Sequence, residues 1–213
     1  MAKTATKSGR AYGGESQKQR DARRRKQLLD AGLQIFGTEG FRSATVRGVC
    51  AEAHVADRNF YESFDSLEGL LIAVHRRSVE ELLAKVVAAI GELTEGMDIE
   101  PAVERGLDAY FAFVEDPLQA RVVWREILGV SPSVDSAYLA DTAMFAEFLI
   151  ALFAIWRPGF TRTDEADVIT TTVVGGLSNM AMVWSLNHYK PPREVMVRAA
   201  GRLLVAVTDV IED

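Results

Sequence analysis

The sequence predicts an all-α protein of about nine helices. Apolar residues recur at three- and four-residue steps in most segments, as Leu29, Leu33 and Phe36 do, which is the spacing of one helix face. No segment shows the sustained two-residue alternation with β-branched side chains that is typical of a strand. Hydrophobic residues make up 48% of the 213 positions, which is enough for a sizeable core.

Capping and breaking residues divide the first 90 positions. Residues 1–19 are rich in Lys, Thr, Ser, Gly and Gln and carry few apolar side chains, so they predict a flexible basic arm. Thr45 and Ser66 are suited to cap the helices that follow them, and Gly37 with Gly40 ends the first helix. The helices predicted in this part cover about 20–36, 46–53, 57–64 and 67–90.

The remainder of the chain is also helical in pattern. Pro101 and Pro117 suit first turns, while the segment 129–133, with Pro132, predicts a break. Thr163 precedes two acidic residues that favour the start of a helix. The helices predicted in this part cover about 101–115, 116–128, 135–156, 163–186 and 191–210.

The charge is divided along the chain. Residues 1–77 hold 14 Lys and Arg against 9 Asp and Glu, a balance of +5, whereas residues 78–213 hold 10 against 21, a balance of −11. The sum is the net charge of −6. A basic front and an acidic remainder indicate local contact with a polyanion, although a solvated basic tract is an equally simple interpretation.

The expected compartment is the cytoplasm. Cys50 is the single cysteine, so an intramolecular disulfide framework is excluded. No uninterrupted apolar run approaches the roughly 18–20 residues of a membrane span, and the basic N-terminus has no apolar stretch behind it. We therefore expect neither a membrane span nor a signal peptide.

The second and third helices, joined by a three-residue turn, match the helix-turn-helix plan. At 100° per residue, Phe60 and Phe64 point to one side of the third helix, Arg58 and Asn59 to the opposite side, and Tyr61 to the flank. Arg is well shaped to bind guanine and Asn to bind adenine in the major groove. The pattern favours a DNA-reading helix.

A further signal is the order of residues over about 23–71. The chain has, in this order, Leu28-Leu29-Asp30-Ala31, Phe36, Glu39-Gly40-Phe41, Thr45-Val46-Arg47, Val49-Cys50-Ala51-Glu52-Ala53-His54-Val55-Ala56, Phe60-Tyr61 and Phe64. This order resembles the tetracycline-repressor (TetR) family. The resemblance implies a homodimeric transcription regulator with an N-terminal DNA-binding domain, here 20–66, and a C-terminal ligand-binding and dimerisation domain, here 67–213.

The resemblance also implies DNA contacts at particular positions. Thr45 is similar to the residue that caps the second helix and binds a phosphate, and Arg47 to a phosphate or base contact. The positions at which the family reads bases are those of Asp57, Arg58 and Asn59. The position at which it binds the DNA backbone is that of Tyr61. As simpler alternatives, Thr45 only caps its helix and Tyr61 only packs.

Four positions depart from the family pattern. His54 stands where a turn glycine is usual, which predicts a strained but possible positive φ. Ala56 replaces a capping serine, Gly48 lies inside the second helix, and Leu67 replaces a phosphate-binding lysine. The basic run 23–26 is a candidate replacement for that lost contact.

The later helices are dense in aromatic and Met side chains, most of which belong to a core. The resemblance implies a cavity among them for a hydrophobic or amphipathic effector. Its predicted lining residues are Tyr110, Trp124, Arg125, Glu126, Phe148, Asn179 and Met180. The last two helices are expected to form the dimer interface, with packing inside the chain as the alternative. Its predicted residues are Val173, Gly176, Leu177, Met180 and Gly201.

Enzyme, metal and cofactor signatures are not recognisable. The three histidines, His54, His75 and His188, are scattered and have no cysteine partner at ligand spacing. We therefore expect a ligand-responsive repressor released from a palindromic DNA operator by a small effector. The alternatives are a helical small-molecule binding protein that has lost specific DNA reading, an activator, and an all-α enzyme.

Overall fold

The computed structural model describes the backbone of residues 16–211 and the side chains of residues 16–208. This part holds nine α-helices and no strand, which confirms the predicted fold class. The helices are α1 (Gln17–Thr38), α2 (Val46–Ala53), α3 (Asp57–Phe60), α4 (Leu67–Ile90), α5 (Glu100–Val114), α6 (Pro117–Arg121), α7 (Pro132–Trp156), α8 (Asp164–Leu186) and α9 (Arg193–Ile211). A 3₁₀ turn (Phe41–Ser43) follows α1, and a π-helical segment (Val122–Glu126) follows α6.

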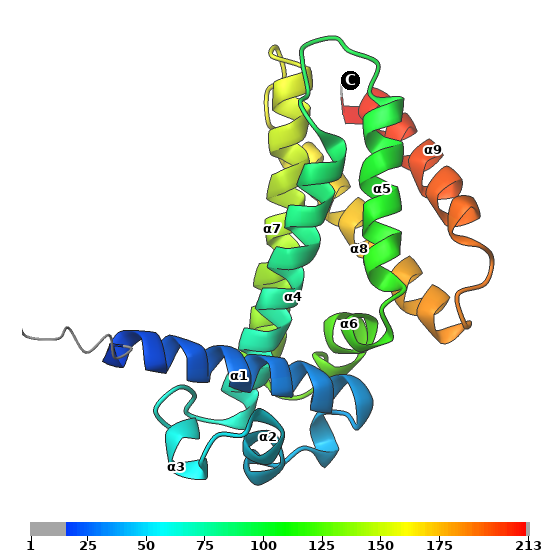
Figure 1. The fold of residues 1–213 in the computed structure, drawn as a ribbon. Coiled ribbons are helices and arrows are strands. Elements are labelled where there is room, and N and C mark those ends of the chain that lie inside the picture. The colour runs from blue at the N-terminus through cyan, green and yellow to red at the C-terminus, as the bar shows by residue number, and fades with distance from the viewer. Residues whose placement is uncertain (1–15, 212–213) are drawn as a thin grey trace, which may run out of the picture.

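The helices form two groups that meet around α1 and α4 (Figure 1). Helices α1, α2 and α3 lie together at one end, and α4 runs away from them beside α7. Helix α5 packs on α4 and α9, while α8 packs on α7. Helix α6 contacts α1 and therefore links the two groups.

Side-chain caps fix most helix starts where they were expected. The Thr45 hydroxyl accepts a hydrogen bond from the Gly48 N–H at 3.0 Å, and Ser66 accepts one from Gly69 at 3.0 Å. Thr163 accepts one from the Ala166 N–H at 3.1 Å. These bonds satisfy donors that have no partner inside the helix, which confirms the predicted starts of α2, α4 and α8.

Several boundaries differ from the predicted ones, among them the end of α1, which runs through Gly37 to Thr38. Helix α1 begins at Gln17, where Ser16 and Gln19 form a capping box, so the last residues of the predicted arm are helical. The rest of that arm, 1–15, lies outside the described residues. Helix α3 ends at Phe60, because the chain tightens into a turn in which the Ser63 N–H donates to the Phe60 carbonyl. Pro132 occupies the first turn of α7 instead of a break.

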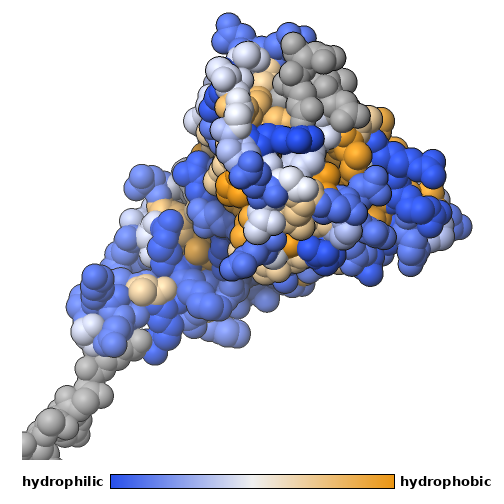
Figure 2. All heavy atoms as spheres, turned by 90° about the horizontal axis from the view of Figure 1, so that it is seen from above, coloured by the Kyte–Doolittle hydropathy of each residue, from blue (hydrophilic) through white to orange (hydrophobic). Residues whose placement is uncertain are grey.

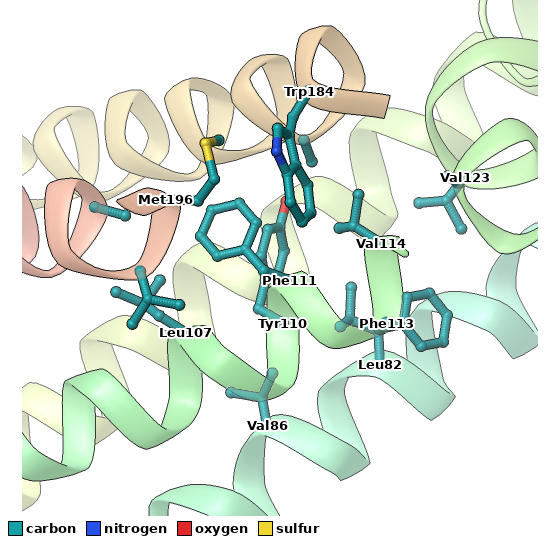
Figure 3. Close-up of a cluster of buried hydrophobic side chains, with 14 of the residues drawn as sticks. Leu82, Val86, Leu107, Tyr110, Phe111, Phe113, Val114, Val123, Trp184 and Met196 are labelled. Carbon is teal, nitrogen blue, oxygen red and sulfur yellow. The ribbon is translucent and has the colours of Figure 1, made fainter. Parts of the chain in front are cut away.

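Two clusters of buried apolar side chains hold the groups together. The first joins α1, α2 and α3 to the start of α4, and it includes Phe36, Phe60 and Leu71. The second lies between α4, α5, α8 and α9 (Figure 3). In it Phe111 packs edge-to-face on Trp184 with ring centroids 5.5 Å apart. Such pairs add to the stabilisation that burial of their area provides.

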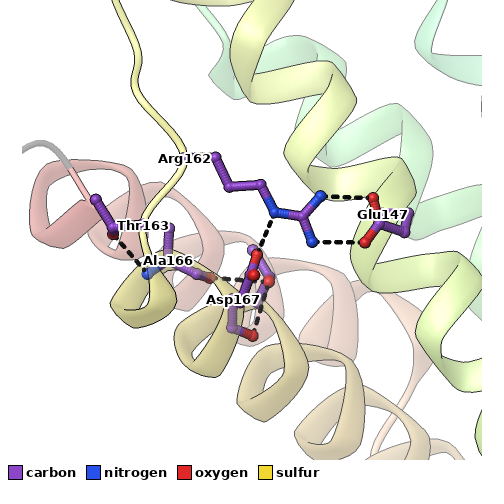
Figure 4. A network of polar contacts seen from close by, with 6 residues as sticks. Glu147, Arg162, Thr163, Ala166 and Asp167 are labelled. Atoms are coloured by element: carbon purple, nitrogen blue, oxygen red, sulfur yellow. Dashed lines mark hydrogen bonds and ion pairs between the residues drawn. The ribbon is translucent and has the colours of Figure 1, made fainter.

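Arg162 fixes the corner between α7 and α8 (Figure 4). Its guanidinium donates two hydrogen bonds to the Glu147 carboxylate, at 2.6 and 2.8 Å, and one to Asp167 at 2.6 Å. The hydrogen bonds from Arg162 lower the pKa of Glu147 below its usual value. All three side chains are exposed, so this corner contributes little to the free energy of folding.

Helices α7 and α8 are apolar along much of their length. Both are long and apolar enough to cross a membrane by length and composition, a test that core helices of soluble proteins also pass. Only 22% of each apolar window is buried within the chain. Figure 2 shows hydrophobic residues reaching the surface of the helical bundle, whereas the surface over α1 is nearly all hydrophilic.

Candidate DNA-binding surface and effector cavity

Helices α2 and α3 form the predicted helix-turn-helix. The turn begins at His54, which has φ 54° and ψ 40°, so the predicted positive φ at this position is confirmed. The His54 N–H donates to the Ala51 carbonyl and the Val55 N–H to that of Cys50, which closes α2. Helix α3 then starts at Asp57 without a side-chain cap from Ala56.

Helix α3 is anchored by aromatic side chains and presents polar ones. Phe60 is fully buried and Phe64 is 6% exposed, as the helical spacing predicted. Arg58 is exposed, while Asn59 is half-buried. Tyr61 is 61% exposed, and its ring packs edge-on against Phe60 at 5.3 Å. Arg58 and Tyr61 are thus available to a partner, and Asn59 only in part.

The remaining predicted DNA contacts also lie at the surface. Arg47 and Asp57 are exposed, and so is Thr45, whose hydroxyl caps α2. The structure brings the six candidate residues onto two packed helices, α2 and α3.

The basic run of α1 has a structural role that the sequence did not reveal. Arg24 contacts Glu62 at 2.8 Å. Arg25 donates to the Ser63 carbonyl at 2.8 Å and lies over the Phe64 ring at 4.3 Å. These two arginines hold α1 against the turn that follows α3. Because they are paired within the chain, they are less available to replace the phosphate contact that is missing at Leu67.

The thiol of Cys50 is buried beneath this surface. Burial, followed by the nearby Asp57 carboxylate, raises the pKa of the thiol above its usual value. Since the thiolate is the reactive form, Cys50 behaves as a small apolar side chain of the core.

Replacing His54 with Gly is expected to stabilise the protein. A side chain at left-handed φ costs about 1–2 kcal/mol, while glycine loses about 0.5–1 kcal/mol through its freedom in the unfolded chain. The expected net gain is about 0.5–1 kcal/mol, measured by urea unfolding. Glu52→Gly, two positions earlier inside α2, is the matched control and is expected to destabilise by about 1 kcal/mol. A loss of stability in His54→Gly would contradict the prediction.

A narrow cavity of about 180 Å³ lies among the helices of the second group. Helices α4, α5, α7, α8 and α9 and the π-helical segment line it, mostly with apolar side chains. Tyr110, Trp124 and Phe148 of the predicted ligand-binding residues line this cavity. Arg125 and Asn179 are exposed and do not line it, and neither does the half-buried Met180.

Glu126 also lies away from the cavity. It accepts a hydrogen bond from the Phe41 N–H at 2.8 Å and one from Arg121 at 2.7 Å. Arg121 in turn donates to the Thr38 carbonyl at 2.6 Å. Glu126 therefore holds the second group of helices to the end of α1. It lies two positions after Trp124, on the other side of the helix from the cavity wall.

The cavity has a polar group at the α4–α7 contact. His75 Nδ1 lies 2.9 Å from Asp141 Oδ2, and Arg76 Nε donates to Asp141 Oδ1 at 3.1 Å. His75 and Asp141 are both buried and both line the cavity. Sequence reasoning missed this pair, since the two residues are 66 positions apart. A histidine on the apolar face of a helix was the available signal.

Tyr110 is a second buried polar group of the cavity wall. Its hydroxyl donates to the Leu177 carbonyl at 3.2 Å, and burial raises its pKa well above the usual value.

Stability is therefore expected to fall at alkaline pH in part because of Tyr110. Above about pH 10 the unfolded chain releases this proton while the folded chain keeps it, so the loss reaches about 1.4 kcal/mol at pH 11. Urea unfolding of wild type and Tyr110→Phe at pH 8 and 11 measures the difference. Equal losses in the two proteins would contradict the prediction.

The predicted interface residues fall in different environments. Val173 and Leu177 line the cavity, and Met180 packs against the core. A Cβ at Gly201 would lie 3.7 Å from Leu107, so this glycine faces α5 of its own chain. A Cβ at Gly176 would meet open space. The large apolar side chains exposed on α8 and α9 include Val168, Val183, Leu186, Val195 and Leu203.

Within the described residues, no group of three His, Cys, Asp or Glu side chains is placed to hold a metal ion.

Comparison with known proteins identifies the family. Residues 28–74 match the family of bacterial regulatory proteins described as the tetR family. The chain is 26% identical to the HTH-type transcriptional activator FasR of Mycolicibacterium smegmatis over 196 residues, which is 90% of this chain and 87% of FasR. It is 28% identical to the HTH-type transcriptional repressor KstR of the same organism over 129 residues, or 54% of this chain and 61% of KstR.

Solved structures share the fold at lower identity. The regulator FadR of Bacillus subtilis, in complex with stearoyl-CoA, superimposes with a TM-score of 0.71 at 16% identity, covering 84% of this chain and 97% of FadR. The fatty acid degradation regulator FadR of Bacillus halodurans has a TM-score of 0.69 at 18% identity, covering 85% and 94%. The chain is similar to DNA-binding transcriptional regulators, and its residues 28–74 match the TetR family of bacterial regulatory proteins.

Proposed function

We propose that the chain is a cytoplasmic, non-enzymatic repressor that binds a palindromic operator as a homodimer and leaves it when an effector fills the cavity. The observation that carries this proposal is helix α3, which is anchored by buried Phe60, and by Phe64 in the turn that follows, while Arg58 is exposed. A twofold dimer would place two such helices in successive major grooves, roughly 34–36 Å apart. Arg47, Asp57 and Tyr61 are then the supporting contacts.

The apolar surface of the last two helices supports the dimer. Val168, Val183 and Leu186 project from α8, and Leu203 projects from α9. Exposed apolar surface of this kind marks association sites. Gly176 adds a place where two helices approach closely, because nothing of its own chain lies near it. The interface thus uses Gly176 and these side chains in place of Gly201.

The form of the cavity supports a slim, largely apolar effector. Its 180 Å³ are below the roughly 300 Å³ at the lower end of drug-sized ligand sites. A narrow space accommodates a chain better than a broad ring system. The FadR of Bacillus subtilis was crystallised with stearoyl-CoA, whose acyl part is such a chain. We assign the effector to amphipathic molecules with an apolar chain.

The π-helical segment supports communication between the two sites. Val123 and Trp124 line the cavity, while Glu126 binds the Phe41 N–H at the end of α1. An effector acts only if it prefers one arrangement of the protein over another. A ligand that displaces Trp124 moves the π-helical segment, which is hydrogen-bonded to the end of α1. This movement changes the position of α3 in each protomer of the dimer.

Repression is the simpler direction of control. A dimer that covers a promoter represses without any contact with RNA polymerase, whereas activation needs such a contact. FasR is an activator and KstR a repressor, so relatives of both kinds exist.

Selection from random DNA duplexes tests the proposal. The purified full chain is expected to enrich a palindromic sequence, with affinity that falls as salt rises. A promoter reporter carrying that sequence then gives the sign of regulation. Enrichment of no sequence would favour a small-molecule binding protein that does not read DNA. Higher reporter output with the chain present would make it an activator.

A further inference from the structure

We propose that His75, held by Asp141, is the polar anchor of the effector and accepts a hydrogen bond from the O–H group of an otherwise apolar chain. This inference rests on the proposed function and names the chemical class of its ligand.

The burial of His75 leaves one ring nitrogen unsatisfied. The residue is 1% exposed and lines the cavity. Its Nε2 atom has no hydrogen-bond partner among the described residues. A buried polar atom without a partner costs about 1–3 kcal/mol, so such atoms are rare unless something else completes them. In a cavity wall, the completing group is part of a ligand.

The contact with Asp141 determines whether His75 Nε2 donates or accepts a hydrogen bond. A carboxylate only accepts hydrogen bonds, so His75 Nδ1, 2.9 Å from Asp141 Oδ2, carries the proton of the neutral ring. Nε2 then holds a lone pair and accepts. Arg76 donates to the other Asp141 oxygen at 3.1 Å and helps to hold that side chain in place. The anchor therefore selects a ligand that donates, such as an alcohol.

Other polar groups of the wall already have partners. Thr142 donates to the Tyr138 carbonyl and Thr170 to that of Ala166, both on their own helices. The Tyr110 hydroxyl donates to the Leu177 carbonyl. Among the side chains that line the cavity, the fully buried polar atom without a partner is Nε2 of His75.

The anchor lies at one end of an elongated space. The lining of α4 runs from His75 to Ile90, a length of roughly 22 Å at about 1.5 Å per residue. Val74, which precedes His75, packs in the cluster of the α1–α3 group, and α4 runs away from that group (Figure 1). Leu93, Ile99 and Leu152 line the cavity beyond. A ligand therefore places its head at His75 and its apolar chain along α4.

Three twelve-carbon probes test the anchor on the wild-type protein: 1-dodecanol, dodecanoic acid and methyl dodecanoate. Binding is followed by the fluorescence of Trp124, which lines the cavity. The alcohol is expected to bind at least about tenfold more tightly than the ester, which has no O–H to donate, and than the acid, which is ionised at neutral pH. With ¹⁵N-labelled histidine, the Nε2 signal of His75 is expected to shift with the alcohol and to stay unchanged with the ester.

Two variants separate an anchor from a merely structural residue. His75→Phe keeps a ring in the wall and is expected to bind the alcohol and the ester equally well. Thr172→Val is the control, because its hydroxyl donates to the Val168 carbonyl of its own helix and the residue is exposed outside the cavity. It is expected to keep the wild-type preference. If His75→Phe does not fold, the wild-type comparison and the ¹⁵N signal still decide.

The outcomes distinguish this inference from the proposed function. Equal binding of all three probes by wild type, with no shift at His75, would overturn the anchor, while release of operator DNA by the ester would leave the repressor intact. Binding of none of the probes would overturn the anchor and the apolar effector together. Operator binding by the free protein, measured separately, tells whether the DNA-reading function stands.

Discussion

Replacing Arg58 with Ala is expected to remove operator discrimination while leaving the fold unchanged. Arg58 is exposed on α3, and among the described residues its side chain has no ion-pair partner to lose. A bidentate contact between Arg and guanine is worth about 1–3 kcal/mol, and a twofold dimer loses it twice, which makes about 2–6 kcal/mol. Affinity for the selected operator therefore falls by at least roughly 30-fold. Electrophoretic mobility shift or fluorescence anisotropy measures it.

The informative quantity is the ratio of specific to non-specific affinity. Arg42→Ala, in the exposed turn after α1, removes the same charge from the same part of the chain. This control is expected to leave the ratio unchanged, because a phosphate contact strengthens binding to every sequence alike. A ratio that survives in Arg58→Ala would mean that another residue reads the bases, with Asn59 and Arg47 next in line. Thermal unfolding verifies that both variants are folded.

Local features of the fold could be predicted from the sequence. The caps at Thr45, Ser66 and Thr163 depend on residues within one helical turn, so their pattern is visible without tertiary contacts. The burial of Phe60 and Phe64 followed from helical spacing for the same reason. Apolar periodicity marks a buried face wherever it occurs, and nearly every helix of the bundle was found in this way.

Features that depend on distant partners could not be predicted. His75 and Asp141 come into contact only because α4 packs on α7, and no spacing along the chain predicts this contact. The continuous α-helix predicted for 116–128 is wrong, because residues 122–126 form a π-helical segment that no local pattern of the sequence indicates. Gly201 was predicted to lie in the dimer interface because it is small. The packing of α9 on α5 instead places it against α5 of its own chain. A small residue fits either a chain's own core or an interface, and only the fold distinguishes them.

Replacing Glu126 with Gln is expected to weaken the junction between the two groups of helices and to uncouple the effector from DNA. The carboxylate accepts from both the Phe41 N–H and Arg121, and an amide of the same shape accepts with one oxygen only. Glu126 and Arg121 are largely buried, so the loss of the charge is expected to cost about 1–3 kcal/mol of stability. Urea unfolding measures this cost.

The effect on regulation follows from where Glu126 lies. It does not line the cavity, so the affinity for the effector is expected to stay within about twofold of wild type. Coupling between two sites is commonly about 1–3 kcal/mol, and the loss of the Phe41 contact should remove most of it. The effector then still binds but no longer lowers operator affinity, which titrations of operator with and without a bound chain compound measure.

Glu147→Gln supplies the matched control for this junction. It also removes a carboxylate that binds an arginine, but both partners are exposed at the α7–α8 corner. It is expected to cost no more than about 1 kcal/mol and to keep the full response to the effector. If Glu126→Gln responds as fully as Glu147→Gln, the signal does not pass through the π-helical segment. It would then have to travel along α4 itself, which joins the cavity at His75 to the DNA-reading group at Leu70 and Leu71.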